Sequence, residues 1–283
     1  MRSLLYVPGI SERMMRKAQE SASDALILDL EDGVAPEQKV EARKIVSRVL
    51  REIEFGTKEI FVRINGLVTE YGLEDVRMVA ASNASGILIP KVEAPDDVMT
   101  VSQFLRSQNV TEEGEQRQKL LCLIESPRGV LSSREIASTS PSVVGLVFGS
   151  ADLVREIGCV LTEGEPELWF ARSQVLLTAR AAGIEAFDSP HFVIADPEGL
   201  RLASRAAKNL GYDGKTIIHP SHIAVVNEVF APTSVEIADA ERVLAAMDAA
   251  MIKGCGAIVF DGRMIDQVHH DRAKKLLSKA RKL

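Results

Sequence analysis

Short apolar segments alternate with amphipathic, helix-like segments eight times between residues 1 and 230, and this alternation limits the possible folds most strongly. The predicted strands are Ser3–Val7, Ala25–Leu30, Glu59–Ile64, Gly86–Ile89, Leu120–Ile124, Val143–Phe148, Glu185–Phe187 and Lys215–Ile218. Helical patterns between successive strands indicate parallel strands joined by crossover helices. Eight such units predict an α/β fold, a (β/α)8 TIM barrel. No GxGxxG follows the first strand, which disfavours a dinucleotide-binding fold.

Residues 231–283 follow the eighth unit as a C-terminal extension. Thr233–Lys253 has the pattern of an amphipathic helix, and a last helix is expected near His269–Lys282. A barrel of eight units does not need this segment. We therefore expect 1–230 to form the catalytic barrel and 231–283 to form a lid or an oligomer arm, with a helix packed on the outside of the barrel as the alternative.

Each predicted strand ends in a polar or conformationally special residue. These residues are Pro8-Gly9, Asp29 with Glu31 and Asp32, Arg63, Lys91, Glu125, Asp152, Asp188 and His219. In a (β/α)8 barrel the carboxyl ends of all strands converge on one face, where active sites lie. The eight positions together predict an active site at that face.

Two of these strand ends carry a carboxylate immediately before or at the start of a helix. Glu125 follows the apolar run Leu121–Ile124, with Ser126 as a predicted N-cap and Pro127 at the first helical position. Asp152 lies in the segment Val143–Leu153, after the strand Val143–Phe148. Two carboxylates without a nearby His or Cys favour Mg²⁺, or Mn²⁺, over zinc. The alternative is that each acid only compensates a helix dipole.

The other strand-end charges have two interpretations each. Asp29, Glu31 and Asp32 are three acids within four residues, so they are candidates for the second shell of the metal or for helix and turn caps. Arg63 suits a bidentate clamp on a substrate carboxylate, or an ion pair with the acidic cluster. For His219, a hydrogen-bonded structural role is favoured over that of a base.

Composition excludes several classes of function. The net charge of −6 argues against a nucleic-acid surface. No apolar run approaches the roughly 18–20 residues of a membrane span. The three cysteines are widely spaced and form no CxxC pair, which favours a reducing compartment. A strand is predicted at the N-terminus, where a signal peptide would lie, so we expect a cytoplasmic location.

Six motifs, in order and spread over nearly the whole chain, resemble one enzyme family. They are Arg2–Gly9, Leu28–Ala35, Val62–Gly66, Ile124–Gly129, Gly149–Leu153 and Gly214–Pro220. They resemble the citrate lyase β-subunit-like branch of the HpcH/HpaI aldolase family. The resemblance implies a (β/α)8 barrel, usually a homotrimer, that cleaves or forms 3-hydroxyacyl thioesters with Mg²⁺.

The resemblance also implies roles for single residues. Glu125 and Asp152 match the metal ligands, and Arg63 matches the residue that binds the carboxylate of the keto or hydroxy acid. The residues that match positions near the coenzyme A nucleotide are Tyr6, Arg13, Lys17 and Lys39. Arg13 stands where a relative has Lys, and Gln38 replaces another basic residue.

In the extension, Phe260–Asp266 resembles the family segment whose last acid reaches the active site of a neighbouring subunit. Asp266 is then the candidate catalytic acid or base. The resemblance therefore implies an Mg²⁺-dependent lyase that converts an acyl-CoA such as citramalyl-CoA or malyl-CoA to acetyl-CoA and a keto acid, pyruvate or glyoxylate. The alternatives are a citrate lyase β subunit that acts on a citryl-acyl-carrier protein, and a non-catalytic barrel that binds acyl-CoA or an organic acid.

Overall fold

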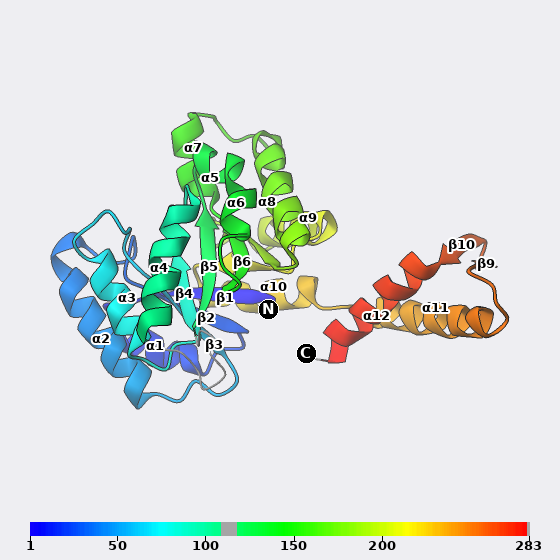
Figure 1. Ribbon diagram of the computed structural model, residues 1–283, viewed down its shortest axis with the longest axis horizontal. Helices are drawn as coiled ribbons and strands as arrows, with labels where there is room; N and C mark the ends of the chain where they lie inside the picture. The colour runs from blue at the N-terminus through cyan, green and yellow to red at the C-terminus, as the bar shows by residue number, and fades with distance from the viewer. Residues whose placement is uncertain (109–117, 282–283) are drawn as a thin grey trace. The chain divides into compact units, whose positions relative to one another are not determined.

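Eight parallel strands close into a barrel, as the alternation predicted. The computed structural model describes residues 1–108 and 118–281. The strands are β1 (Ser3–Pro8), β2 (Ala25–Asp29), β3 (Glu59–Arg63), β4 (Gly86–Ile89), β5 (Lys119–Ile124), β6 (Val143–Phe148), β7 (Glu185–Asp188) and β8 (Gly214–Ile217). Each strand pairs with the next, and β8 pairs with β1. Figure 1 labels strands β1 to β6 of this barrel. The (β/α)8 prediction is therefore confirmed.

Helices on the outside of the barrel connect the strands. They are α1 (Glu12–Gln19), α2 (Lys39–Glu52), α3 (Gly72–Ala80), α4 (Pro95–Gln108), α5 (Pro127–Leu131), α6 (Ser133–Ala137), α7 (Ser150–Ile157), α8 (Trp169–Ala182), α9 (Pro197–Leu210) and α10 (Ile223–Phe230). Three short 3₁₀ helices, η1 (Pro36–Gln38), η2 (Pro166–Leu168) and η3 (Pro220–His222), precede α2, α8 and α10. Proline opens each of the three, because its fixed φ suits a first helical position.

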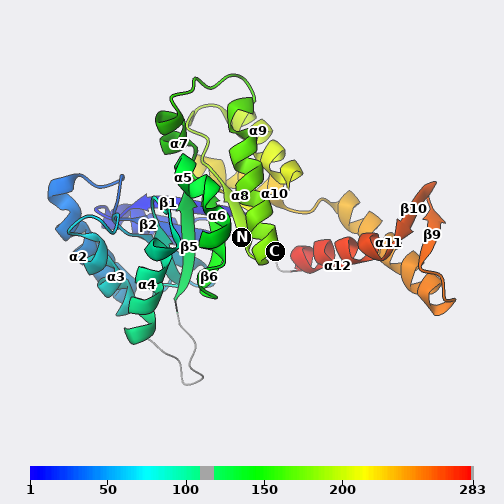
Figure 2. The ribbon, with the colours of Figure 1, turned by 45° about the horizontal axis from the view of Figure 1, so that its top comes forward.

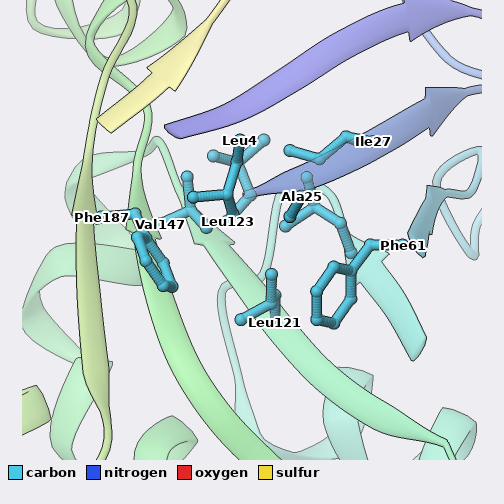
Figure 3. Packing of buried hydrophobic residues seen from close by; sticks show 9 residues of the cluster. Leu4, Ala25, Ile27, Phe61, Leu121, Leu123, Val147 and Phe187 are labelled. Atoms are coloured by element: carbon cyan, nitrogen blue, oxygen red, sulfur yellow. The ribbon is translucent and has the colours of Figure 1, made fainter. Parts of the chain in front are cut away.

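The inside of the barrel is a packed apolar core. Its buried residues are Leu4, Ala25, Ile27, Phe61, Leu88, Leu121, Leu123, Val147 and Phe187, which come from strands β1 to β7. Figure 3 shows Phe61 beside Leu121 in this cluster. Within β2 and β5 the core residues are two positions apart, because alternate side chains of a strand point to the same face. Because apolar side chains fill the inside of the barrel, an active site has to lie at one of its ends.

The connections around β5 and β6 partly differ from the expectation. Ser126 caps α5 by accepting a hydrogen bond from the backbone N–H of Gly129 at 3.0 Å, as predicted. Residues 127–137 form two helices, α5 and α6, which are divided at Ser132. Helix α7 was not anticipated as an element of its own, although it carries Asp152 in its first turn. Residues 109–117 lie outside the described residues.

The chain divides into two compact units, Met1–Asn227 and Glu228–Leu283. The second unit contains α11 (Ser234–Ile252), a hairpin of β9 (Ala257–Phe260) and β10 (Arg263–Asp266), and α12 (Gln267–Arg281). Within this unit α11 and α12 pack side by side (Figure 2). The unit has an apolar core of its own, formed by Ala240, Val243, Met247, Ile265 and Ala273.

A capping box starts α11, in which Thr233 and Glu236 satisfy each other's backbone N–H groups. In the parts of the chain that the structure describes, no helix is long and apolar enough to cross a membrane.

Candidate active site at the mouth of the barrel

The polar residues of the site continue the inward-facing rows of the core. Tyr6 follows Leu4, Asp29 follows Ile27, Arg63 follows Phe61 and Glu125 follows Leu123, in each case two residues further along the strand. Because side chains alternate along a strand, each of these four stands on the same face as the core residue before it. The strand pattern therefore places them together above the core, at the carboxyl ends of β1, β2, β3 and β5.

Arg63 and Asp29 form a buried, bidentate ion pair. The Nε and Nη2 atoms of Arg63 each donate to a carboxylate oxygen of Asp29 at 2.7 Å. Burial opposes the charge, but the hydrogen bond to Asp29 and its charge raise the pKa of Arg63 above its usual value. Asp29 also accepts from the backbone N–H groups of Glu31 and Gly33. The ion pair considered for Arg63 is present, and the proposed substrate clamp has to operate beside it.

Glu31 lies between two cations. Its Oε1 accepts a hydrogen bond from Lys91 Nζ at 2.7 Å, and its Oε2 lies 3.2 Å from Arg63 Nη1. Burial raises the pKa of Glu31. Asp32, in contrast, is exposed, and its carboxylate approaches Arg63 at 3.7 Å. The three acids predicted as a second shell thus have different environments.

The four residues predicted near the coenzyme A nucleotide also differ. Arg13 and Lys17 are exposed and lie four residues apart, on one face of α1. Tyr6 lies in the mouth, with the guanidinium carbon of Arg63 4.8 Å from its ring centroid. Lys39 is buried, and its ammonium donates to the carbonyls of Leu30 and Glu31 at 2.9 and 2.6 Å. This placement does not support a nucleotide contact by Lys39, because its donors are directed into the loop after β2.

Glu125 is a buried carboxylate surrounded by negative charge. Its Oε1 accepts a hydrogen bond from the backbone N–H of Lys91 at 2.8 Å. Burial, followed by the charge of Glu31 and, less strongly, that of Asp152, raises the pKa of Glu125 to about 8. Asp152 forms an ion pair with Arg155 one turn along α7, and the Arg155 side chain is largely exposed. The charge of Asp152 thus acts on Glu125, and Asp152 stands in the first turn of α7.

Gly149 makes this approach possible. A Cβ atom at this position would lie 2.6 Å from Glu125 Cβ and 3.0 Å from its Oε2. Gly149 is also the N-cap residue of α7, so the helix that carries Asp152 begins directly beside Glu125. A larger residue would push α7 and Glu125 apart.

The donor set fits a hard divalent cation. Within 1–108 and 118–281, no three His, Cys, Asp or Glu side chains are arranged to hold a metal ion. Two carboxylates are nevertheless a sufficient protein contribution for Mg²⁺, which usually keeps several waters and takes further oxygens from its substrate. A cation held by Glu125 and Asp152 would offset the repulsion that raises the pKa of Glu125. The residues present therefore fit the predicted Mg²⁺ site.

Asp266 ends the hairpin of the C-terminal unit and is partly exposed. Its Oδ1 pairs with Nδ1 of His269 at 2.8 Å and accepts from the backbone N–H of Val268 at 3.0 Å. The hydrogen bond with His269 lowers the pKa of Asp266, so the carboxylate is ionised at neutral pH. An ionised carboxylate is the form that accepts a proton.

Two ion-pair networks were not predicted from the sequence. Lys91 was placed at the active-site face without a partner, and the structure shows that it contacts both Glu31 and Glu125. Lys215, on β8, is fully buried and forms an ion pair with Asp188, which also pairs with Arg172 of α8. An isolated Lys at the start of an apolar run was the available signal for this pair. His219 pairs with Ser221 through Nδ1 at 2.7 Å, which agrees with the structural role favoured for it.

A (β/α)8 barrel with buried acids, an arginine and a lysine gathered at the carboxyl ends of its strands has the architecture of a barrel enzyme. Residues 2–220 match the HpcH/HpaI aldolase/citrate lyase family, and residues 176–282 match the C-C bond lyase family of the TIM-barrel fold. The chain belongs to the HpcH/HpaI aldolase/citrate lyase family, as the six motifs indicated, and is a carbon–carbon lyase.

Several relatives match over almost their whole length. A (3S)-malyl-CoA thioesterase of Cereibacter sphaeroides is 37% identical over 279 residues, which are 99% of this chain and 94% of the relative. The citrate lyase subunit β of Escherichia coli is 35% identical over 280 residues, 99% of this chain and 93% of the relative. The crystal structure of CitE from Mycobacterium tuberculosis in complex with magnesium, acetoacetate and coenzyme A is 31% identical, with a TM-score of 0.81 and coverage of 99% and 97%.

Proposed function

We propose that this chain is an Mg²⁺-dependent acyl-CoA lyase. It cleaves a 3-hydroxyacyl-CoA such as citramalyl-CoA or malyl-CoA to acetyl-CoA and pyruvate or glyoxylate, or it catalyses the reverse condensation. The observation that carries the proposal is the buried carboxylate of Glu125, which shares the barrel mouth with Asp152 and Arg63. A magnesium, acetoacetate and coenzyme A complex of a relative supports the same choice of cofactor and substrate class.

Glu125 and Asp152 would hold Mg²⁺ in this proposal, with Mn²⁺ as a possible substitute. When bound, the ion supplies Lewis-acid polarisation of the substrate oxygens that become the keto acid. Arg63 would bind the substrate carboxylate. Its ion pair with Asp29 fixes the plane of the guanidinium, so that the remaining N–H groups have a set direction.

Arg13 and Lys17 would contact the phosphates of coenzyme A from the exposed face of α1, with Tyr6 nearer the reacting centre. Lys39 contributes by fixing the loop after β2 through two carbonyl groups. The nucleotide would therefore lie on the β1 and α1 side of the mouth.

Asp266 would act as the acid and base. In cleavage it accepts the hydroxyl proton, the carbon–carbon bond breaks, the electron pair forms the enolate of the acetyl thioester, and Asp266 returns the proton to the enolate carbon. In condensation it removes a proton from the acetyl methyl group, the enolate adds to the keto carbon, and the proton passes to the resulting alkoxide oxygen. A homotrimer, in which Asp266 acts in the site of a neighbouring copy, is part of the proposal.

The three free cysteines support a reducing location, for which we propose the cytoplasm. Cys122 is buried in β5, where burial raises the pKa of its thiol to about 12 and makes it inert. The other two, Cys159 and Cys255, are more accessible.

A coupled assay with purified protein tests the activity. Citramalyl-CoA, malyl-CoA and 3-methylmalyl-CoA are each incubated with Mg²⁺, and acetyl-CoA or propionyl-CoA, keto acid and free coenzyme A are measured separately. Chelator-sensitive release of pyruvate or glyoxylate with equimolar acyl-CoA is the expected result. Equimolar malate and free coenzyme A would instead indicate hydrolysis, the reaction named for the Cereibacter sphaeroides relative.

The control variant is Glu125→Gln, which keeps the size of the side chain but removes the ligand charge. It should lose both turnover and Mg²⁺ binding. Turnover on an acyl-carrier-protein thioester, with none on the coenzyme A thioesters, would favour the citrate lyase β-subunit alternative. Thioester binding without turnover on either carrier would favour the non-catalytic barrel.

A further inference from the structure

Lys91 has a backbone conformation that is unusual for a residue with a side chain. Its φ is +50°, in the left-handed region that favours glycine. It follows Pro90, directly after the end of β4. Non-glycine residues remain in this region when the surrounding structure holds them there, and such positions cluster at functional sites. The contacts of Lys91 show what this conformation achieves.

Contacts of the following residue fix the turn at Lys91 beside β5. The next residue, Val92, donates its backbone N–H to the carbonyl of Leu123 at 3.2 Å. The N-terminus of α5 packs against the same turn, since a Cβ on Gly129 would lie 2.5 Å from the carbonyl oxygen of Val92. The turn that precedes these contacts directs the N–H of Lys91 to Glu125 Oε1, at 2.8 Å.

The side chain of Lys91 makes the second contact. Its ammonium donates to Glu31 Oε1 at 2.7 Å, and Glu31 is itself buried and restrained by Arg63 at 3.2 Å. Asp32 lies further from the ammonium, at 4.0 Å. One residue is thus tied to β2 by its side chain and to Glu125 by its backbone.

We infer that Lys91 is a positioning residue for the metal ligand Glu125. The left-handed backbone directs an N–H at one carboxylate oxygen of Glu125, and the ion pair with Glu31 offsets the cost of that conformation for a residue with a side chain. The other oxygen is then left oriented for the cation. This inference rests on the proposed Mg²⁺ site, and groups that orient metal ligands typically change metal affinity by about 10- to 100-fold when they are lost.

Two substitutions separate the backbone from the side chain. Lys91→Gly and Lys91→Ala remove the same ammonium, and therefore change the charge near the metal equally. Glycine adopts a positive φ without strain, whereas alanine does not. Lys91→Arg keeps a cation for Glu31, and Lys44→Ala removes an exposed lysine of α2 as a control for net charge.

The measurement is the Mg²⁺ dissociation constant of each purified protein by isothermal titration calorimetry, with thermal unfolding recorded in parallel. The wild type, Lys91→Arg and Lys44→Ala should agree. Lys91→Gly should stay within about threefold of them, and Lys91→Ala should bind at least about tenfold more weakly. Raising Mg²⁺ should restore turnover to Lys91→Ala, because the defect is in holding the ligand.

Equal affinities for Lys91→Gly and Lys91→Ala would overturn the inference while leaving the proposed function intact. A loss of thermal stability with an unchanged Mg²⁺ affinity in both would show a structural role only, and would also overturn it. No Mg²⁺ binding by the wild type would overturn the proposed function, and the inference with it.

Discussion

Replacing Gly149 by alanine should separate the two proposed metal ligands. The added Cβ would lie 2.6 Å from Glu125 Cβ. Ordinary carbon–carbon contacts are about 3.5–4.0 Å, so Glu125 or the start of α7 has to move by roughly 1 Å. Gly149 has a φ of −106° and a ψ of 105°, a conformation that alanine adopts freely. The effect would therefore come from the collision and not from backbone strain.

Overpacking of this kind typically lowers the free energy of unfolding by about 1–3 kcal/mol. The same displacement moves a metal ligand, so we expect at least about a tenfold loss of Mg²⁺ affinity. Chemical denaturation measures the first quantity and calorimetric titration the second. Gly66→Ala is the matched control, because nothing lies within 4 Å of a Cβ at that position. Wild-type stability and Mg²⁺ affinity in Gly149→Ala would refute the reasoning.

Three further predictions concern the acid, the buried ion pair and pH. Asp266→Asn should lower kcat by about 10²- to 10⁴-fold while Mg²⁺ affinity is unchanged, and steady-state kinetics that match the wild type would remove its role. Asp188→Asn should lower the free energy of unfolding by about 3–5 kcal/mol, because the ammonium of Lys215 is left buried without its partner; the double variant with Lys215→Met should recover part of this loss in denaturant titrations. Burial opposes the ionisation of Asp188, but Lys215 and Arg172 lower its pKa below the usual value of about 3.9. A depressed pKa in the folded state contributes stability above the unfolded pKa, which is lost as the pH falls through the folded pKa. Unfolding free energies measured from pH 6 down to pH 2 should therefore fall less steeply for Asp188→Asn than for the wild type, and parallel curves would contradict this assignment.

At the mouth of the barrel, Arg63 and Lys91 each form an ion pair with a buried acid. Arg63 is committed to Asp29 by two hydrogen bonds, and Lys91 to Glu31 by one. Glu125 accepts a hydrogen bond from a backbone N–H. Among the described residues, no Lys or Arg side chain forms an ion pair with it. This is the arrangement expected where a divalent ion completes the charge balance.

The barrel, and the polar residues at the carboxyl ends of its strands, could be predicted from the sequence alone. Strand–helix alternation restricts the connections to parallel crossovers, and the two-residue period of a strand continues from core residues such as Leu123 to Glu125. The six motifs added the family, which the comparisons confirmed. All of these signals are local, so they are readable without knowledge of which strands become neighbours.

The pairing of the charges at the mouth could not be predicted and depends on the tertiary structure. Arg63 pairs with Asp29, Lys39 turns into the loop after β2, and the N–H of Lys91 reaches Glu125. The partners of the last pair are 34 residues apart, and their contact depends on a left-handed turn at a lysine, which no local pattern indicates. Ion-pair geometry depends on the register of neighbouring strands and on which charged groups remain within reach of each other after burial. Both are properties of the closed barrel.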